Sequence, residues 1–283
     1  MGTTELPPFS LLLPVYAGDT AKHLDRAFRS SVHQQTVPPS EVVLVQDGPV
    51  GAELVAKIAE LIADSPVPVR LVPIPQNVGL ARALTLGLAE CANDVVARMD
   101  ADDISLPERF AVQVPLIAQG HDLVGSGMYE FTEDEAGTET LGSTRNPPTA
   151  SADIARIARF HDPFNHPTVV YTKSAVTRAG GYGPPALMED YFLFARMIAD
   201  GAHTCNSAQW LVMYRVSSGA YKRRGGLALL SSELELQREM RRIGFTSRTQ
   251  WLRNVAVRGG YRLIPQSVRR AIYGRFMLRG HRP

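Results

Sequence analysis

The sequence has little cysteine and no long hydrophobic run. Cys91 and Cys205 are its only cysteines, and they form no CxxC pair and no cluster with histidine. This argues against a structural zinc site and against a disulfide scaffold. No stretch reaches the ~18 apolar residues that a membrane-spanning helix needs, and no basic start leads into an apolar run as in a signal peptide. We therefore expect no targeting segment, no membrane span and a cytoplasmic location.

The remaining composition is that of a folded globular protein. Hydrophobic residues make up 45% and charged residues 20% of the 283 residues, close to the average for soluble domains. The 20 Pro and 23 Gly are scattered along the chain. These values exclude a disordered or fibrous chain, and the length suits one large domain or two modest ones.

Charge is distributed unevenly along the chain. Residues 222–283 hold 15 Lys and Arg against three acids, a net charge of +12, whereas residues 1–221 hold 15 bases and 25 acids, a net charge of −10. An acidic body with a basic tail indicates an anionic partner for the tail, either a phospholipid surface or a nucleic acid.

Short apolar strands alternate with helical stretches in the first hundred residues. We expect strands at 9–16, 41–47, 69–74 and 94–99, with helices at 20–35, 51–64 and 79–91. This alternation predicts an α/β fold with a mostly parallel sheet flanked by helices. Ligands of such sheets bind beyond the carboxyl ends of the strands. Polar residues gather at those ends, in segments 14–19, 47–48, 76–79 and 100–103.

The pattern is looser in the second half of the chain. We expect helices at 107–119 and 188–200, strands at 122–130 and 210–216, and a loop or short hairpin at 131–150. The tail from about residue 226 is predicted to be helical, with a break at Gly259-Gly260.

The acidic run Asp100-Ala101-Asp102-Asp103 follows an apolar strand directly. Carboxylates this close repel one another unless a positive charge lies among them, and a divalent cation that binds a diphosphate would supply it. The alternative is a solvated acidic turn that caps the helix beginning near Pro107. The position of this run beside three other polar strand ends favours a binding site.

Six motifs in this order and spacing resemble those of the family 2 glycosyltransferases. The motifs are Ser10–Tyr16, Val45–Gly48, Asn77–Arg82, Asp100–Asp103, Pro107–Arg109 and Met188–Tyr191. The resemblance covers about residues 8–216 and implies an inverting enzyme of the Rossmann-like GT-A fold that uses nucleotide-diphosphate sugars. It implies a catalytic domain at 1–221, with a nucleotide-sugar half at about 8–105 and an acceptor half at about 106–221. A basic helical extension at 222–283 would follow.

The resemblance also implies which residues bind the nucleotide sugar. Pro14, Val15 and Tyr16 would hold the base in a loop, Asp47 would hydrogen-bond the base, and Arg82 would lie near the nucleotide. Further residues of the same motifs are Asn77, Gly79, Asp100 and Ala101. Structural alternatives remain open: Tyr16 as strand-end core, Asp47 as a turn former and Arg82 as a solvated helix residue.

Asp100-Ala101-Asp102 resembles the DxD motif of the family. The resemblance implies that Asp102 binds a divalent metal, Mn²⁺ or Mg²⁺, and that Asp100 faces the ribose or the metal. Asp103 would support these two carboxylates from behind. The metal would stabilise charge on the departing nucleoside diphosphate.

Glu189-Asp190 matches the acidic pair of the family, in which the aspartate is the general base. Asp190 would then take the proton of the acceptor hydroxyl, as an inverting transfer requires, and Glu189 would contact the acceptor. The structural alternative is a pair of carboxylates that stabilise a helix N-terminus. His166 lies where relatives have a residue near the acceptor, and a structural role is equally open.

One feature of the family is missing. Many relatives have a histidine shortly after the last core strand, where this chain has Ser217 and Ser218. Arg215, or the run Lys222–Arg224, is expected to neutralise the diphosphate instead.

The tail combines apolar residues at helical spacing with interleaved arginines. The apolar residues are Trp251, Leu252, Val255, Val268, Ile272 and Phe276; the arginines are Arg253, Arg258, Arg269, Arg270, Arg275 and Arg279. Such helices lie on anionic membranes, where each basic residue contributes roughly 1 kcal/mol. The alternative is a helix packed on the catalytic domain. Nucleic acid is not the expected partner, because no recognisable binding module accompanies the charge.

The sequence thus predicts an inverting glycosyltransferase, cytoplasmic or peripheral on the inner face of the membrane. It would transfer a sugar, expected to come from a UDP-sugar, to a saccharide or lipid-linked saccharide in surface polysaccharide or glycolipid synthesis. One alternative is a sugar-phosphate nucleotidyltransferase, but the loop Pro14–Asp19 lacks the Gly-rich basic character of a triphosphate site. The other is a degenerate, membrane-docked partner of an active transferase.

Overall fold

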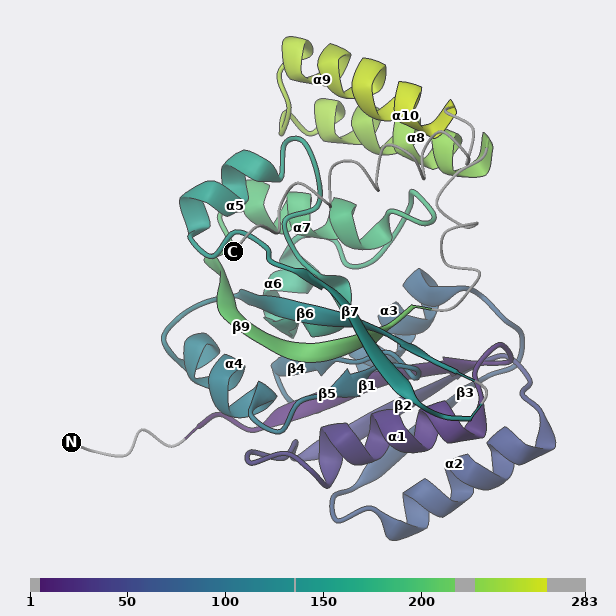
Figure 1. Ribbon diagram of the computed structural model, residues 1–283. Helices are drawn as coiled ribbons and strands as arrows, with labels where there is room; N and C mark the ends of the chain where they lie inside the picture. The colour runs from purple at the N-terminus through teal and green to yellow at the C-terminus, as the bar shows by residue number, and fades with distance from the viewer. Residues whose placement is uncertain (1–5, 135, 217–226, 264–283) are drawn as a thin grey trace. The chain divides into compact units, whose positions relative to one another are not determined.

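The computed structural model describes residues 6–134, 136–216 and 227–263 (Figure 1). Contacts divide the chain into two compact units. The larger unit comprises the described residues of Met1–Pro184 and Glu189–Val216. The smaller unit comprises residues 185–188 and the described residues beyond 216. The domain boundary predicted at 221/222 lies outside the described residues and stays a prediction.

One nine-stranded sheet forms the centre of the larger unit. Its strands are β1 Phe9–Tyr16, β2 Glu41–Asp47, β3 Val69–Ile74, β4 Val95–Arg98, β5 Ile104–Ser105, β6 Leu123–Glu133, β7 Glu139–Arg145, β8 Val170–Thr172 and β9 Thr204–Arg215. Their order is β3-β2-β1-β4-β8-β6-β9-β5, with β7 paired to β6. The parallel arrangement expected from the sequence covers β3, β2, β1 and β4. Because β8 runs antiparallel to both β4 and β6, the whole sheet is mixed.

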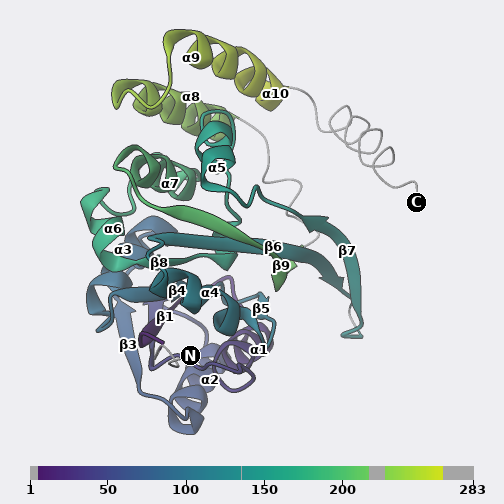
Figure 2. The same cartoon turned by 90° about the vertical axis from the view of Figure 1, so that its left-hand side faces the viewer.

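Helices cover both faces of this sheet (Figure 2). They are α1 Ala21–Val32, α2 Ala52–Asp64, α3 Leu80–Glu90, α4 Arg109–Ala118, α5 Ser151–Ile157, α6 Lys173–Arg178 and α7 Glu189–Ala199. The helices and strands expected from the sequence form near the predicted bounds, except that β9 begins at Thr204, six residues before the predicted start, and segment 131–150 contains the expected hairpin, β6–β7. Helices α5 and α6 and strands β5 and β8 were not predicted.

The side chains of β1 alternate between the two faces, as the pleat of a strand requires. Leu11 and Leu13 are buried with residues of α1, α2 and α4, whereas Leu12 packs with residues of α3, α6 and α7. Because both faces of β1 are covered by helices, the strand is mostly apolar and does not alternate with polar residues; its one buried hydroxyl, that of Ser10, donates to Glu41 at 2.5 Å. Helix α3 approaches the sheet most closely at Gly87, where a Cβ atom would lie 2.3 Å from Val45 Cγ2 and 2.5 Å from Leu12 Cδ1.

We expect Gly87→Val to lower the free energy of unfolding by about 1–3 kcal/mol, because the added atoms overpack the contact between α3 and the sheet. Gly183→Val is the matched control, since a Cβ at Gly183 has nothing within 4 Å. Urea unfolding of the two variants measures the difference. Equal stability of both would show that α3 can move away from the sheet without loss.

The smaller unit contains a helical hairpin, with α8 Leu227–Arg242 packed against α9 Arg248–Asn254, a π-helical turn Val255–Gly259 and α10 Gly260–Leu263. Helix α8 is followed by Gly244 in a left-handed conformation, φ 76°, and the Phe245 N–H donates back to the Met240 carbonyl, as in a Schellman ending. The break predicted at Gly259-Gly260 is wrong: the chain stays helical through both glycines by widening into the π-helical turn.

A buried carboxylate ties the two sides of this hairpin together. Glu233 of α8 is fully buried and accepts hydrogen bonds from Arg258, at 2.6 and 2.9 Å, and from Arg262 at 3.2 Å. These ion pairs hold the pKa of Glu233 low against the effect of burial, which by itself raises it. Arg258, expected from the sequence on the arginine-rich outer face, is therefore a structural residue of the hairpin.

We find no helix among the described residues with the length and hydropathy needed to cross a bilayer. The tail residues Ser217, Ser218, Lys222–Arg224, Val268, Arg269, Arg270, Ile272, Arg275, Phe276 and Arg279 lie outside the described part of the chain, so the expectations that rest on them stay predictions.

Candidate functional site

Asp47 organises the loop between β3 and α3. Its carboxylate accepts hydrogen bonds from the Val78 N–H at 2.7 Å, the Gly79 N–H at 3.0 Å and the Asn77 side-chain amide at 2.9 Å. Gly48 follows in a left-handed conformation, φ 85°, and a Cβ there would lie 2.6 Å from the Asn77 backbone nitrogen. A carboxylate offers about four acceptor positions, so Asp47 keeps capacity for a further donor after anchoring this loop.

The loop after β1 turns back through a second aspartate. The Tyr16 N–H donates to the Asp19 carboxylate at 2.9 Å, and the Tyr16 ring, which is 50% exposed, leaves no room for a side chain at Gly18. Burial, together with the nearby Asp102 and Asp100, raises the pKa of Asp19 to about 7 even though the Tyr16 N–H lowers it.

These two loops and the acidic turn border one cleft of about 370 Å³ at the carboxyl ends of β1, β2 and β4. Eight of the nine residues expected to bind the nucleotide sugar line it, together with the expected metal ligand Asp102; the eight are Pro14, Val15, Tyr16, Asp47, Asn77, Gly79, Asp100 and Ala101. Arg82 is exposed on α3 and is not among the lining residues. Four lining residues were not predicted: Asp19, Leu80, Ala83 and Tyr214.

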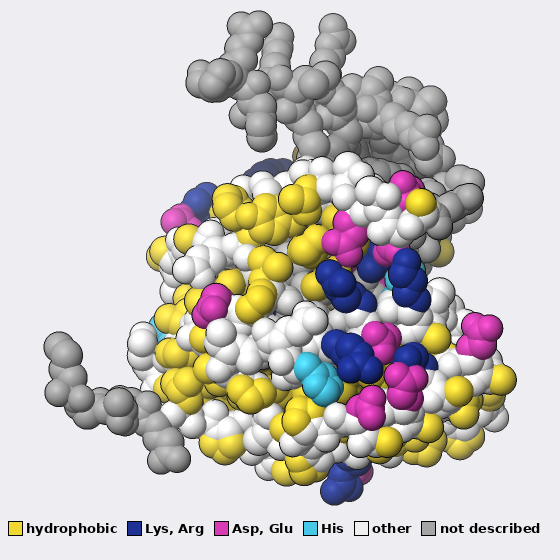
Figure 3. All heavy atoms as spheres, turned by 60° about the horizontal axis from the view of Figure 1, so that its bottom comes forward, with side chains coloured by type: hydrophobic (Ala, Val, Ile, Leu, Met, Phe, Trp, Pro, Cys, Tyr) yellow, Lys and Arg dark blue, Asp and Glu magenta, His cyan; other side chains and the backbone are white. Residues whose placement is uncertain are grey.

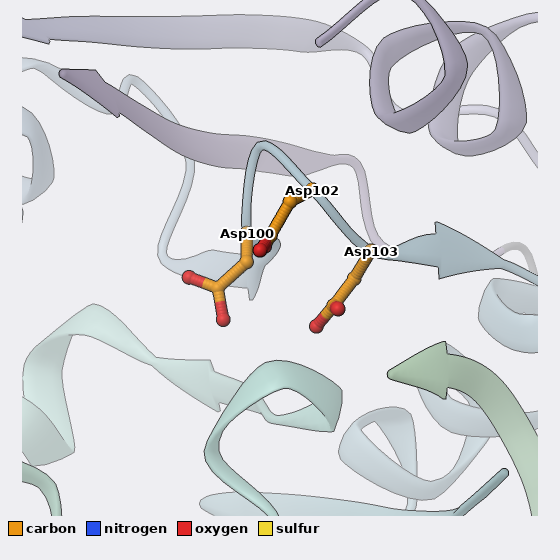
Figure 4. Close-up of side chains that lie close together, drawn as sticks. All are labelled: Asp100, Asp102 and Asp103. Carbon is orange, nitrogen blue, oxygen red and sulfur yellow. The ribbon is translucent and has the colours of Figure 1, made fainter. Parts of the chain in front are cut away.

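The turn after β4 carries three carboxylates that extend toward the same side (Figure 4). Oxygen atoms of Asp100, Asp102 and Asp103 lie within 4.8 Å of one another. Burial, and then the charge of Asp100, raises the pKa of Asp102 to about 6 and that of the fully buried Asp103 well above its ordinary value. One oxygen of Asp103, Oδ2, is buried and has no hydrogen-bond donor among the described residues.

These observations fit a divalent cation held by the acidic turn. Arg98 forms a bidentate ion pair with Asp100, which offsets one negative charge, while Asp102 and Asp103 retain raised pKa values. A hard cation prefers carboxylate oxygens and would relieve this repulsion. Asp102 is partly exposed to the cleft and would bind the ion together with Asp100, and Oδ2 of Asp103 is an acceptor still available next to them.

Arg98 is the buried cation of the site, with 2% of its surface exposed. Burial by itself lowers its pKa, but Asp100, Tyr182 and Asp103 raise it by more, so the guanidinium stays charged. Its charge also lowers the pKa of Asp190 and that of His166. No role was assigned to Arg98 from the sequence; a charged residue at the end of an apolar strand beside three aspartates is the signal that points to it.

Two further arginines fix the acidic turn in place. Arg109, fully buried, donates to the Arg98 carbonyl at 2.6 Å and to the Pro167 carbonyl at 3.1 Å. Arg215 donates from Nε to the Asp102 carbonyl at 2.8 Å and from its backbone N–H to Asp103 at 2.8 Å. Its guanidinium is also paired with Glu133. Arg215, expected at the diphosphate, thus touches the backbone of the turn and does not line the cleft.

Asp190, at the start of α7, lies beside His166. Its Oδ2 is 3.6 Å from His166 Nδ1, and its Oδ1 accepts from the Tyr191 N–H at 2.7 Å. Burial raises the pKa of Asp190 and lowers that of His166 well below its ordinary value, so the imidazole is neutral at pH 7. His166 Nε2 is 3.1 Å from the Tyr182 hydroxyl, which fixes the ring and leaves Nδ1 facing the carboxylate.

Glu189, the other member of the predicted acidic pair, is the first residue of α7, directly before Asp190, and is partly buried. Both carboxylates lie in the first turn of the helix, where the helix dipole stabilises negative charge. Neither Glu189 nor Asp190 borders the cleft that holds the acidic turn. The charge of Asp100 nonetheless raises the pKa of Asp190, so the two groups of carboxylates belong to one electrostatic environment.

We expect Asp19→Asn to stabilise the metal-free protein at pH 8. Folding raises the pKa of Asp19 from 3.8 to about 7. The ionised carboxylate therefore destabilises the folded state, and this destabilisation is complete above pH 7. It decreases as the pH falls and vanishes below 3.8. Partial exposure screens part of this effect, so we expect about 1 kcal/mol, a rise of ~2–4 °C in Tm. Thermal unfolding in EDTA at pH 4 and pH 8 measures it; an equal shift at both pH values would contradict it.

The chain is similar to known glycosyltransferases over most of its length. The profile of Glycosyl transferase family 2 matches residues 10–179. The amylovoran biosynthesis glycosyltransferase AmsE of Erwinia amylovora is 37% identical over 268 residues, 94% of this chain and 97% of the relative. The UDP-Gal:alpha-D-GlcNAc-diphosphoundecaprenol beta-1,3-galactosyltransferase of Escherichia coli is 33% identical over 280 residues, 97% of this chain and 98% of the relative.

The fold has a counterpart among solved structures. The mannosyltransferase PcManGT from Pyrobaculum calidifontis, in complex with GDP-Man and Mn²⁺, superposes with a TM-score of 0.65 at 14% identity, covering 97% of this chain and 81% of that one. At this identity the likeness concerns the fold alone.

Proposed function

Because the chain belongs to glycosyl transferase family 2 and is a glycosyltransferase with the expected GT-A fold, we propose that it is an inverting enzyme. The reaction is transfer of a sugar from a nucleoside diphosphate to a saccharide acceptor. The observation that carries this proposal is the cleft in which the acidic turn of Asp100 and Asp102 faces the Asp47 and Tyr16 loops. In this proposal the acidic turn supplies the cation ligands, and the two loops hold the planar base.

The proposed donor is a UDP-sugar. The relative from Escherichia coli uses UDP-Gal by its name and matches 97% of this chain. In this proposal the loop Pro14–Tyr16 and the remaining acceptor capacity of Asp47 hold the base. Asn77 and Gly79 shape the adjoining wall of the cleft, and Arg82, exposed on α3, comes near the nucleotide from outside the cleft.

Asp102 and Asp100 are proposed to hold a divalent cation, Mn²⁺ or Mg²⁺. The acidic turn fits such an ion, and a solved structure with the same fold contains Mn²⁺. The ion would supply positive charge next to the phosphate oxygens on which negative charge accumulates as the sugar departs. Asp103, held by the Arg215 backbone N–H, keeps the turn in the conformation that presents both ligands.

Asp190 is the proposed general base. The acceptor hydroxyl attacks the anomeric carbon on the face opposite the nucleotide, its proton passes to a carboxylate oxygen of Asp190, and the bond from that carbon to the diphosphate oxygen breaks with its electron pair leaving on the nucleotide. The configuration at the anomeric carbon is inverted as a result. Burial raises the pKa of Asp190 above its ordinary value, which makes the carboxylate a stronger base than one in water. His166 orients this carboxylate through Nδ1.

A saccharide carried on a lipid is the proposed acceptor, in the synthesis of a surface polysaccharide or glycolipid. The Escherichia coli relative acts on a diphosphoundecaprenol-linked sugar by its name, and the Erwinia relative is named for amylovoran biosynthesis. Glu189, next to the proposed base, is the proposed contact to the acceptor. Such an acceptor would bring the enzyme to the membrane surface, which the basic C-terminal extension suits.

We expect UDP to raise the Tm in the presence of Mn²⁺ and to raise it far less without the metal. At 100 times its dissociation constant a ligand stabilises the fold by about 2.7 kcal/mol. Asp102→Asn should abolish the metal-dependent part of the shift, whereas Asp153→Asn, at an exposed carboxylate of α5, should leave it unchanged. A panel of UDP, GDP and dTDP identifies the base. No shift with any nucleotide would favour the degenerate, non-catalytic partner.

Replacing the proposed base should separate binding from turnover. We expect Asp190→Asn to lower kcat about 10²–10⁴-fold while the nucleotide-dependent shift in Tm stays that of the unmodified protein. Asp200→Asn, at an exposed aspartate that follows the same helix, serves as the control. In the unmodified enzyme kcat/KM should rise with pH through a pKa above the ordinary value for aspartate, because the base must lose its proton. Undiminished turnover in Asp190→Asn would exclude this mechanism.

A further inference from the structure

The helical hairpin of the smaller unit has a cavity of its own, of about 330 Å³. Arg238 and Arg241 of α8 line it together with Arg248, Trp251 and Leu252 of α9. Three arginine side chains and an indole ring therefore border one hollow, and its wall is mostly apolar.

The arginines of this hairpin fall into two groups according to their partners. Arg258 and Arg262 share the buried Glu233, and Arg242 is paired with Glu239 at 2.7 Å. Each of these three arginines thus has a carboxylate partner that balances its charge in full or in part.

The three arginines of the cavity are not balanced in this way. No carboxylate in the described part of the chain lies within ion-pair distance of Arg238, Arg241 or Arg248, and Arg241 donates a long hydrogen bond, of 3.5 Å, to the Thr246 carbonyl. The basic side chains over α1 and α2 differ from these three arginines, because they lie among acidic side chains (Figure 3). Examples are the pairs of Arg29 with Asp25 and of Lys57 with Glu60. Positive charge without a counter-charge is thus concentrated around the cavity.

Apolar side chains are exposed on the same helical segment. Leu252 is 59% exposed and Val257 is 63% exposed, and Trp251 is partly exposed at the wall of the cavity. Tryptophan favours the boundary between water and hydrocarbon, where the ring is apolar and its N–H is hydrated. Arginine forms paired hydrogen bonds with phosphate oxygens. An anionic amphiphile satisfies both groups of side chains at once.

We propose that this face of the hairpin docks on anionic phospholipid headgroups, with the charges of Arg238, Arg241 and Arg248 near the headgroup phosphates and with Trp251 and Leu252 in the acyl boundary. The site would hold the enzyme at the membrane that carries its acceptor, so this inference rests on the proposed lipid-linked acceptor. The sequence predicts attraction to anionic membranes for the basic tail as a whole, and this proposal places that attraction on three specific arginines.

Sedimentation of the full-length protein with vesicles tests the site. We expect binding to vesicles of phosphatidylcholine and phosphatidylglycerol, weakening as salt is raised, and little binding to phosphatidylcholine alone. Each arginine at an anionic surface contributes about a fivefold gain in affinity. The triple variant Arg238→Gln, Arg241→Gln, Arg248→Gln should therefore bind about 100-fold more weakly.

A matched triple variant controls for net charge. Arg70→Gln, Arg156→Gln and Arg178→Gln remove the same charge from exposed positions of the larger unit and should leave vesicle binding nearly unchanged. Equal loss in both triple variants would overturn the proposal, because the attraction would then come from overall charge. Undiminished vesicle binding by the cavity variant would also overturn the proposal. Tighter binding of the unmodified protein to duplex DNA than to anionic vesicles would overturn it as well.

Tryptophan fluorescence gives a second measure of vesicle binding, and it also detects weak binding. In Trp210→Phe the remaining tryptophan is Trp251, and its emission should shift to the blue on addition of phosphatidylglycerol vesicles. Glycerol phosphate without a lipid tail should give no such shift; the same shift with glycerol phosphate would mean a soluble phosphate site and overturn the membrane assignment.

Failure of this site and failure of the proposed enzyme activity are distinguishable. The nucleotide-dependent rise in Tm involves the cleft of the larger unit and no vesicles. A cavity variant that loses vesicle binding but keeps the UDP shift supports docking and leaves the catalytic assignment intact. An unmodified protein that binds vesicles through the cavity but shows no nucleotide shift would remove the catalytic assignment alone.

Discussion

The site depends on one buried positive charge, the guanidinium of Arg98. Asp100, Asp103 and Asp190 all lie in its field, and Asp100 binds it in a bidentate ion pair. Breaking a buried ion pair by removing one partner typically costs about 3–5 kcal/mol, since the remaining charge is left without compensation. Without Arg98 the carboxylate of Asp100 would lose its counter-charge, and the acidic turn would carry negative charge with less compensation.

The remaining structure holds this charge and its partners in position. Arg109 binds the carbonyl of Arg98 and that of Pro167, and so connects the end of β4 to the turn that carries His166. Arg215 binds the backbone of the acidic turn from β9. Strands far apart in the sequence are thereby joined at the carboxyl edge of the sheet. Burial, together with the neighbouring carboxylates, raises the pKa values of Asp19 and Asp102, and a bound cation would relieve the repulsion between the carboxylates.

The smaller unit uses arginine in two different ways. Arg258 and Arg262 form ion pairs with Glu233 inside the hairpin, and these pairs hold the π-helical turn against α8. Arg238 and Arg248 border an open cavity beside an exposed leucine. Both kinds of arginine look alike in the sequence, because spacing along a helix does not say which side chains meet a buried carboxylate on the neighbouring helix.

The sequence by itself determined the alternation of strands and helices, the family, and the residues at the strand ends, because hydrophobic period and local turn chemistry are properties of short segments. That Asp47, Asp100 and Tyr16 border one cleft also followed, since parallel strands end at a common edge. Only the tertiary structure decided which long-range partners these residues have. Arg98 as the buried counter-charge, Arg215 bound to the turn and Arg82 outside the cleft depend on contacts between distant segments, which no local pattern encodes.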